Sequence, residues 1–147
     1  MTPIPRDFRE FLQSLNANDV EYLLIGGYAV GFHGYPRATS DIDVWIAMTP
    51  QNAAKVVGAL RDFGFAVPAL TQELFLLPDS IIRMGVKPML IEISTTISGV
   101  DFDECYAARV QAEIEGLSVP IINAAHLKIN KAASGRLKDL ADLENLP

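Results

Sequence analysis

Two apolar runs, separated by a short link, decide how the N-terminal half of this chain folds. The first ends in two glycines, Tyr22-Leu23-Leu24-Ile25-Gly26-Gly27, and the second opens with two aspartates, Asp41-Ile42-Asp43-Val44-Trp45-Ile46. Short apolar runs bounded by glycine and polar residues are typical of buried β-strands. The two runs therefore predict two strands, and the glycines and aspartates at their ends indicate a functional site as well as a core.

The second run places two carboxylates on one face of its strand. Successive side chains of a strand point to opposite faces, so Asp41, Asp43 and Trp45 share one face, while Ile42 and Val44 share the other. Neighbouring carboxylates repel each other and lose solvation unless a positive group lies between them. Oxygen ligands suit a hard divalent cation. The pattern therefore predicts a Mg²⁺ site.

The two glycines predict a phosphate site beside this metal. Gly26 and Gly27 end an apolar strand, where the missing side chain lets the backbone bend tightly and approach a ligand. A short helix is expected directly after them, over Tyr28–Gly34, and amides at the start of a helix favour anionic groups such as phosphate. A metal beside a phosphate indicates phosphoryl or nucleotidyl transfer.

Taken together, these residues resemble the nucleotidyltransferase superfamily of the DNA polymerase beta type. The shared pattern is an apolar strand, Gly-Gly, a short link, and Asp-x-Asp inside a second apolar strand. The fuller form is similar to the small bacterial branch related to abortive-infection and toxin-antitoxin nucleotidyltransferases, and it comprises Gly26-Gly27, His33-Gly34, Arg37-x-Thr39 and Asp41-Ile42-Asp43. The resemblance implies an α+β fold with a polymerase-beta-type core: a mixed β-sheet with helices packed on one face, in two layers.

A third carboxylate, Glu92, interrupts a later apolar strand expected over Met89–Thr95. A charge at such a position is costly unless it is paired or bound to metal, and the alternative is a solvent-facing position on an edge strand. The family brings its third carboxylate on a later strand, so the resemblance favours Glu92, in a slot where this branch usually carries aspartate. Its implied role is either to complete a metal site or to take the proton of the attacking hydroxyl.

Two residues of the link, Arg37 and Thr39, belong to the predicted nucleotide site. They either contact the triphosphate or orient Asp41. The alternative is an exposed loop arginine and a threonine that only begins a strand. The resemblance favours a role in nucleotide binding, together with Gly26 and Gly27.

The C-terminal helical segment, residues 123–147, carries a cluster of cations in an otherwise acidic chain. Asn123 predicts the N-cap of a helix in which Lys128 and Lys131 share a face, and Gly135 predicts its end. A solvated helix face is the usual meaning of such a cluster. The segment also resembles the family's closing motif of lysine, arginine and Lys-Asp-Leu-x-Asp, which implies that the lysines reach the nucleotide phosphates. The nucleotide-binding residues implied here are Lys128, Lys131, Lys138 and Asp139.

Composition bounds the remaining choices. The chain has 147 residues, 50% of them hydrophobic, which predicts one nucleotidyltransferase domain over residues 1–147. A net charge of -6 argues against a broad nucleic-acid-binding surface. The single cysteine, Cys105, excludes an internal disulfide, and no Cys/His cluster has zinc-ligand spacing. The sequence shows no leader-like segment and no apolar stretch of membrane-spanning length, so we expect a cytoplasmic protein with no membrane partner.

The predicted function is transfer of a nucleoside monophosphate from a nucleoside triphosphate such as ATP to a hydroxyl, with Mg²⁺ or Mn²⁺ as cofactor. A tRNA, a protein and a small molecule all remain open as acceptors. The resemblance also implies the toxin-like component of a toxin-antitoxin system, with a cognate antitoxin protein as partner, and the small size favours a homodimer. The alternative is a catalytically weak nucleotide-binding protein that serves as a regulatory partner.

Overall fold

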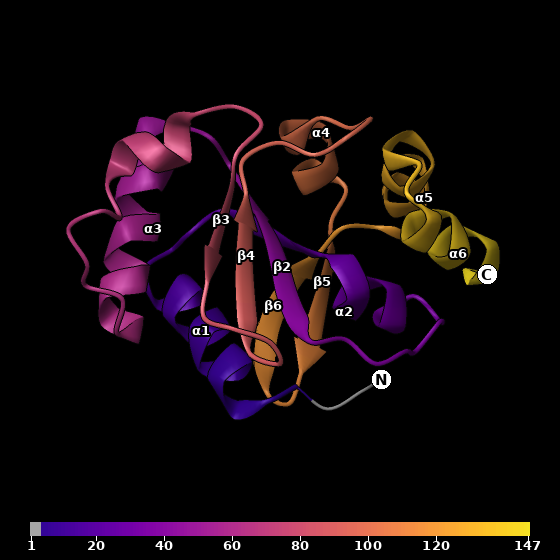
Figure 1. Cartoon of the computed structure of the whole chain (residues 1–147), viewed down its shortest axis with the longest axis horizontal. Helices are drawn as coiled ribbons and strands as arrows, with labels where there is room; N and C mark the ends of the chain where they lie inside the picture. Colours follow the sequence, from indigo (N-terminus) through magenta and orange to yellow (C-terminus); the bar gives the residue numbers. More distant parts are fainter. Residues whose placement is uncertain (1–3) are drawn as a thin grey trace.

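A six-stranded mixed β-sheet, in the order β3-β4-β2-β1-β6-β5, forms the centre of the fold (Figure 1). The structure, a computed structural model, describes residues 4–147. The strands are β1 (Tyr22–Ile25), β2 (Asp41–Ile46), β3 (Ile81–Met84), β4 (Leu90–Ser94), β5 (Val110–Ile114) and β6 (Leu117–Ile121). The helices are α1 (Arg6–Ala17), α2 (Gly26–Phe32), α3 (Pro50–Phe63), the 3-10 helix η1 (Gln72–Leu76), α4 (Phe102–Ala107), α5 (Ala124–Ser134) and α6 (Leu137–Asn145).

Strand pairing brings the predicted acidic residues to one place in the sheet. The aspartate strand β2 lies between β1, with which it is antiparallel, and β4, with which it is parallel. In this register Asp43 lies opposite Ile25 on one side and opposite Glu92 on the other. The end of the glycine-terminated strand and the two acid-bearing strands therefore meet, and the strand predicted around Glu92 is confirmed as β4.

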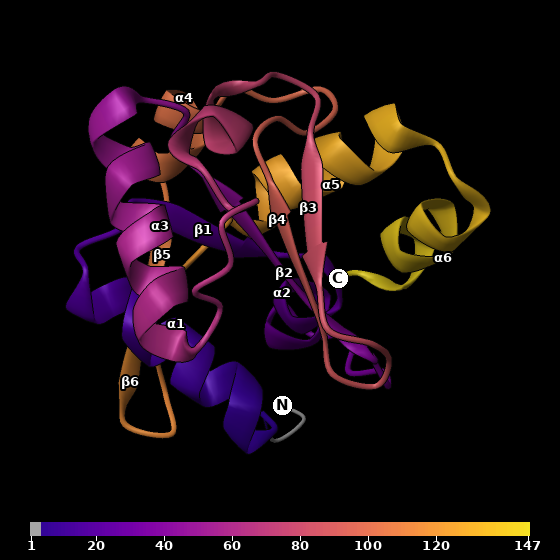
Figure 2. The same cartoon turned by 60° about the vertical axis from the view of Figure 1, so that its left-hand side comes forward.

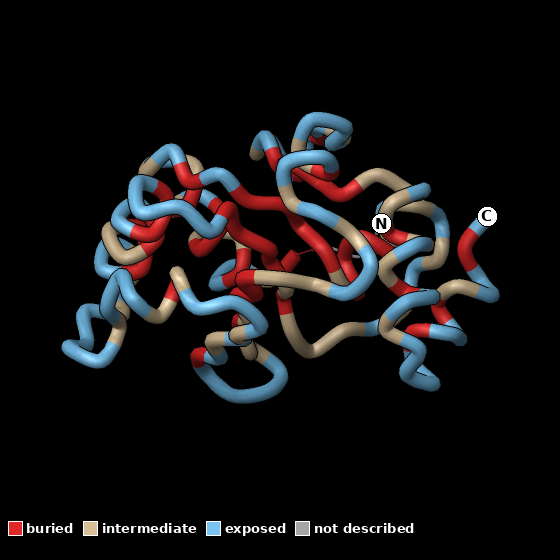
Figure 3. Tube along the Cα trace, turned by 90° about the horizontal axis from the view of Figure 1, so that it is seen from above, coloured by how far each residue is buried: buried red, intermediate tan, exposed pale blue. Residues whose placement is uncertain are grey.

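One face of the sheet is apolar and fully covered. Ile42, Val44 and Ile46 are completely buried, as the alternation along β2 predicts. Helices α1 and α3 lie together on one side of the sheet (Figure 2), and α1 buries its apolar stripe there. Buried segments run through the centre of the fold, while the outer sides of the helices are exposed (Figure 3). Burial of this stripe and of the strand aliphatics supplies most of the apolar stabilisation.

The opposite face carries Asp41, Asp43 and Trp45 and is covered only in part. Trp45 is buried, and its ring meets Phe102 of α4 edge to face, with centroids 5.1 Å apart. Helices α5 and α6 pack against each other and lie on the right in Figure 1, across the sheet from α1 and α3. The mixed sheet and the α+β class are thus confirmed, and the acidic residues lie in an opening between β3 and the C-terminal helices.

Local signals fix both ends of α3 and of α5. Thr49 accepts a hydrogen bond from the amide of Asn52 at the start of α3, and Asn123 does the same for α5. Gly64 and Gly135 end these helices in the left-handed conformation. These caps were all expected from the sequence. In the described part of the chain, no helix combines the length and the apolar character that crossing a membrane requires.

Two expectations about local structure need correction. The helix expected from Tyr28 begins two residues earlier, because Gly26, at a φ of 71°, turns the chain directly out of β1 and both glycines form the first turn of α2. Pro120 was expected on an edge or at a strand end. Its strand β6 lies inside the sheet, between β1 and β5, and the parallel pairing with β1 is confined to Leu24 and Ile121. The missing amide of Pro120 therefore costs no bond to β1.

Candidate active site

Three carboxylates converge on the partly covered face of the sheet. Asp41 and Asp43 come from β2 and Glu92 from the adjacent β4, and each offers an oxygen within 4.8 Å of the other two. Among residues 4–147 this is the one set of three or more acidic, histidine or cysteine side chains close enough to share a metal ion. All three are half-buried, so the adjacent cavity reaches them.

The electrostatics of this trio fit a divalent cation. Burial, together with the neighbouring charges of Asp41 and Glu92, raises the pKa of Asp43 to about 7 against the opposing effect of Lys138 and Lys131. Three oxygen donors that destabilise one another in this way match the preference of Mg²⁺ and Mn²⁺ for carboxylate ligands. The trio could therefore hold a hard divalent cation, which would relieve the repulsion.

The two glycines lie directly against the acidic residues. A Cβ added at Gly26 would come within 2.1 Å of Oδ2 of Asp43, and one at Gly27 would come within 2.9 Å of Oγ1 of Thr39. The sequence pattern predicted that the glycines make room for a ligand. The structure adds a second reason for the glycines. The missing side chain of Gly26 makes room for the carboxylate of Asp43, and that of Gly27 makes room for Thr39, which contacts Asp41.

Thr39 contacts Asp41 directly. Its hydroxyl lies 2.9 Å from Oδ1 of Asp41 and 3.1 Å from the backbone carbonyl oxygen of the same residue, to both of which it can donate. Of the two roles left open for Thr39, orientation of Asp41 is the one for which the structure shows contacts. Arg37, two residues earlier, turns away from the carboxylate trio and donates from Nε and Nη2 to the two carboxylate oxygens of Asp142, at 2.7 and 2.8 Å.

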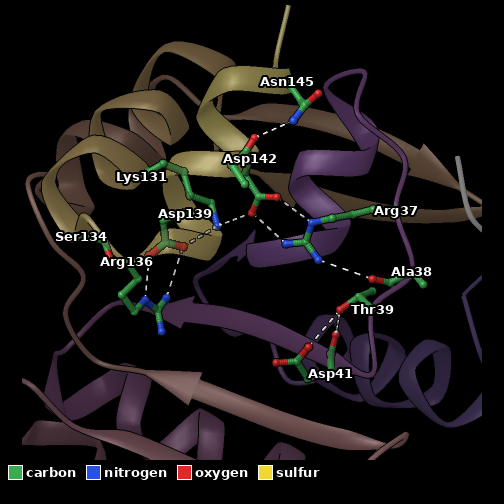
Figure 4. A network of polar contacts seen from close by, with 11 residues as sticks. Arg37, Ala38, Thr39, Asp41, Lys131, Ser134, Arg136, Asp139, Asp142 and Asn145 are labelled. Atoms are coloured by element: carbon green, nitrogen blue, oxygen red, sulfur yellow. Dashed lines mark hydrogen bonds and ion pairs between the residues drawn. The ribbon is translucent and has the colours of Figure 1, made fainter.

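A buried ion network joins this link to the C-terminal helices (Figure 4). Lys131 is only 5% exposed, and its Nζ lies 3.2 Å from Oδ1 of Asp139 and 3.2 Å from Oδ2 of Asp142. Asp142 therefore lies between Lys131 and Arg37, while Arg136 contacts Asp139 at 2.7 Å. The interpretation of Lys131 as part of a solvated helix face is wrong, because its two carboxylate partners hold it in the interior.

The two aspartates stay charged in this network. Burial raises the pKa of Asp139, but hydrogen bonds from Arg136, Ser134 and Lys131 outweigh it and hold the pKa at about 2. Burial also raises the pKa of Asp142, but the hydrogen bonds from Arg37 and Lys131 outweigh this effect and hold the pKa below its ordinary value. A charged pair of aspartates is what a buried lysine and two arginines require.

A cavity of about 400 Å³ lies between the acidic trio and the C-terminal helices. Lys138 and Arg136 line it on the helical side, and Arg83 of β3 lines it beside Glu92, at 3.7 Å. Lys128 is not among the lining residues, and its Nζ donates to the carbonyl oxygen of Pro147. The cavity therefore has carboxylates on its floor and cationic side chains on its walls, which suits a metal-bound polyphosphate. Lining residues also include the predicted Gly26, Gly27, Lys131 and Asp139.

Sequence reasoning missed one charged residue of this site and gave two others only as part of the family's closing motif. Arg83 lies opposite Glu92 in the antiparallel pairing of β3 with β4, and only that register reveals the contact. Arg136 and Asp142 fall inside the C-terminal motif, and their spacing around Asp139 was the available signal. His33 of the motif lies elsewhere, with Nε2 2.7 Å from the carbonyl oxygen of Ile122.

The fold is shared with solved structures of the nucleotidyltransferase fold. A candidate nucleotidyltransferase from Thermotoga maritima superposes with a TM-score of 0.62 at 16% identity, over 95% of this chain and 89% of that one. The lincosamide antibiotic adenylyltransferase LnuA, in its lincomycin-bound form, has a TM-score of 0.62 at 16% identity, over 99% of this chain and 98% of that one. No protein-family model and no curated protein matches the chain. At this identity the likeness concerns the fold.

Proposed function

We propose that this protein is a metal-dependent nucleotidyltransferase that moves a nucleoside monophosphate from a nucleoside triphosphate to a hydroxyl acceptor. The observation that carries the proposal is the convergence of Asp41, Asp43 and Glu92 within 4.8 Å, on the floor of a cavity with cationic walls. Carboxylates alone would repel a triphosphate, and cations alone would not organise its reaction. The combination suits a bound metal-nucleotide complex.

The acidic trio would hold Mg²⁺ or Mn²⁺, which when bound supplies charge neutralisation at the triphosphate. Thr39 orients Asp41 through its hydroxyl, while Gly26 brings the backbone close to Asp43 and Gly27 brings it close to Thr39. Glu92 serves either as a third ligand or as the acceptor of the hydroxyl proton. Its carboxylate lies 3.7 Å from Nε of Arg83 on the neighbouring strand.

The helical wall would bind the triphosphate. Lys138 and Arg136 line the cavity and present positive charge to it, whereas Lys131 acts from the interior through its field and by fixing two aspartates. In the reaction, the acceptor oxygen forms a bond to the α-phosphorus as the bond between that phosphorus and the bridging oxygen breaks. Pyrophosphate leaves with the electron pair, and the hydroxyl proton passes to Glu92 or to water.

The test is release of pyrophosphate from each of the four ribonucleoside triphosphates, with α-labelled nucleotide, Mg²⁺ or Mn²⁺, and a fractionated cell extract as the acceptor source. We expect a labelled product with wild type and none with the double variant Asp41→Asn, Asp43→Asn. Asp7→Asn, at an exposed position on α1, provides the matched control for loss of a carboxylate. Equal behaviour of wild type and double variant, with nucleotide still bound, would support the alternative of a regulatory nucleotide-binding protein.

The proposal of a toxin-like role, acting in the cytoplasm and restrained by an antitoxin protein, has its own test. Expression of the wild-type chain should arrest growth, and Asp43→Ala should relieve the arrest. Growth unaffected by either chain would count against this role while leaving the transferase proposal intact. A homodimer is tested by light scattering with and without nucleotide.

A further inference from the structure

A second cavity adjoins the first along the same face of the sheet. It encloses about 290 Å³ beyond the end of β2, next to α4, and Thr96 lines both cavities. Trp45 and Phe102 lie in its wall, and these two rings contact each other edge to face. The acidic trio and this aromatic cavity are therefore neighbouring compartments of one surface.

The wall of the second cavity combines apolar and negatively charged groups. Met48, Val100 and the two aromatic rings supply apolar surface, and Asp101 and Asp103 supply carboxylates. The lining residues include no lysine, arginine or histidine. A ligand with an apolar or aromatic body and a positive charge complements this wall, because the apolar side chains can bury its body and the carboxylates attract its charge.

We propose that this cavity binds the acceptor, and that the acceptor is a small hydroxylated cation with an aromatic or apolar body. The inference rests on the proposed nucleotidyl transfer at the neighbouring acidic trio. Trp45 lies two residues from Asp43 on the same strand face, a rise of about 7 Å. A hydroxyl arm of a few bonds spans this distance, and its oxygen forms the new bond to the α-phosphorus as pyrophosphate leaves.

Charge separates this acceptor from the others that the sequence left open. The 3′ end of an RNA would bring phosphates against Asp101 and Asp103, on a chain whose net charge is -6. Proteins that bind nucleic acid need basic surface along the phosphate backbone. A volume of 290 Å³ is at the lower end of small-molecule sites, which fits a compact ligand.

Binding can be followed at the site itself, because Trp45 is the single tryptophan of the chain. The probes are octopamine, para-hydroxyphenylglycol and para-hydroxymandelate, which share a hydroxylated aromatic body and end in an ammonium, a neutral hydroxyl and a carboxylate. Each is titrated into the full chain without nucleotide, with fluorescence excited at the red edge of tryptophan absorption. We expect a saturable change with octopamine, about tenfold weaker binding of the glycol, and weaker binding still of the anion.

Asp103→Asn gives the decisive comparison, with Asp7→Asn as the matched control on α1. Asp103 is exposed, so the substitution leaves the core intact. We expect Asp103→Asn to weaken octopamine binding about five- to tenfold without changing binding of the glycol, and Asp7→Asn to change neither. Equal affinity for the three probes, no saturable change with octopamine, or equal effects of the two variants would overturn the proposal. Since no nucleotide is present, these outcomes are independent of whether the acidic trio transfers a nucleotide.

Discussion

Replacing Gly26 by alanine should strain the backbone and also displace a carboxylate of the acidic trio. At a φ of 71°, an alanine costs about 1–2 kcal/mol of left-handed strain. Its Cβ would also come within 2.1 Å of Oδ2 of Asp43, whereas ordinary contact begins at 3.4 Å. The carboxylate must therefore move by about 1.3 Å, and misplacement by about 1 Å at a reacting centre can cost on the order of 100-fold in activity.

Gly116→Ala is the matched control for this variant. Gly116 has a φ of 80° in the β5–β6 turn, and an added Cβ would meet nothing within 4 Å. Gly116→Ala should lower the melting temperature by about 3–6 °C for a domain of this size, and Gly26→Ala should lower it further because its Cβ also meets Asp43. Calorimetry with Mn²⁺ should show about 10- to 100-fold weaker binding for Gly26→Ala and unchanged binding for Gly116→Ala. Wild-type Mn²⁺ affinity in Gly26→Ala would refute the steric argument.

Three further perturbations test the site. The pKa of Asp43 is raised from 3.8 to about 7, so between these pH values the metal-free folded state binds more protons than the unfolded state. The free energy of unfolding, measured with a chelator, should therefore fall as the pH rises from about 4 to about 7. Mn²⁺ affinity should rise over the same range as the proton leaves, and Asp43→Asn should flatten the stability curve; a flat wild-type curve would contradict this assignment. Lys131→Met leaves two aspartates in the interior with one cation fewer and should cost about 3 kcal/mol in urea unfolding, while Lys128→Met, which removes a half-buried lysine outside this network, should cost less than about 0.5 kcal/mol; equal losses would argue against the buried network. Thr39→Val removes the hydrogen bond to Asp41 and should weaken Mn²⁺ binding about tenfold, with recovery in Thr39→Ser; no recovery would mean that packing rather than the hydroxyl is responsible.

The parts of this protein that the sequence predicts are those governed by local rules. Alternation along residues 41–46 predicts which face carries the aspartates, and Thr49, Gly64 and Asn123 predict helix ends because caps depend on neighbouring backbone groups. The positions of Lys138 and Asp139 along the cavity followed from the family resemblance, whereas Gly26 and Gly27 were already indicated by their place at the end of an apolar strand.

The parts that the sequence does not predict depend on contacts between distant segments. Arg37 and Asp142 are 105 positions apart, and nothing near either residue indicates that they pair. The burial of Lys131 follows from the packing of α6 against α5, which places two carboxylates around one ammonium group. Lys128, three residues earlier on the same helix, is half-buried away from the cavity, so charge pattern alone could not distinguish the two lysines.

The contact between Arg37 and Asp142 also bears on when the site becomes complete during synthesis. The strands that carry Asp41, Asp43 and Glu92 emerge from the ribosome before α6, so the nascent chain gains its repelling carboxylates first. The partners of Arg37 and Lys131 arrive only with the last helix. In a nascent chain Arg37 and Lys131 therefore lack these carboxylate partners until α6 has packed against α5.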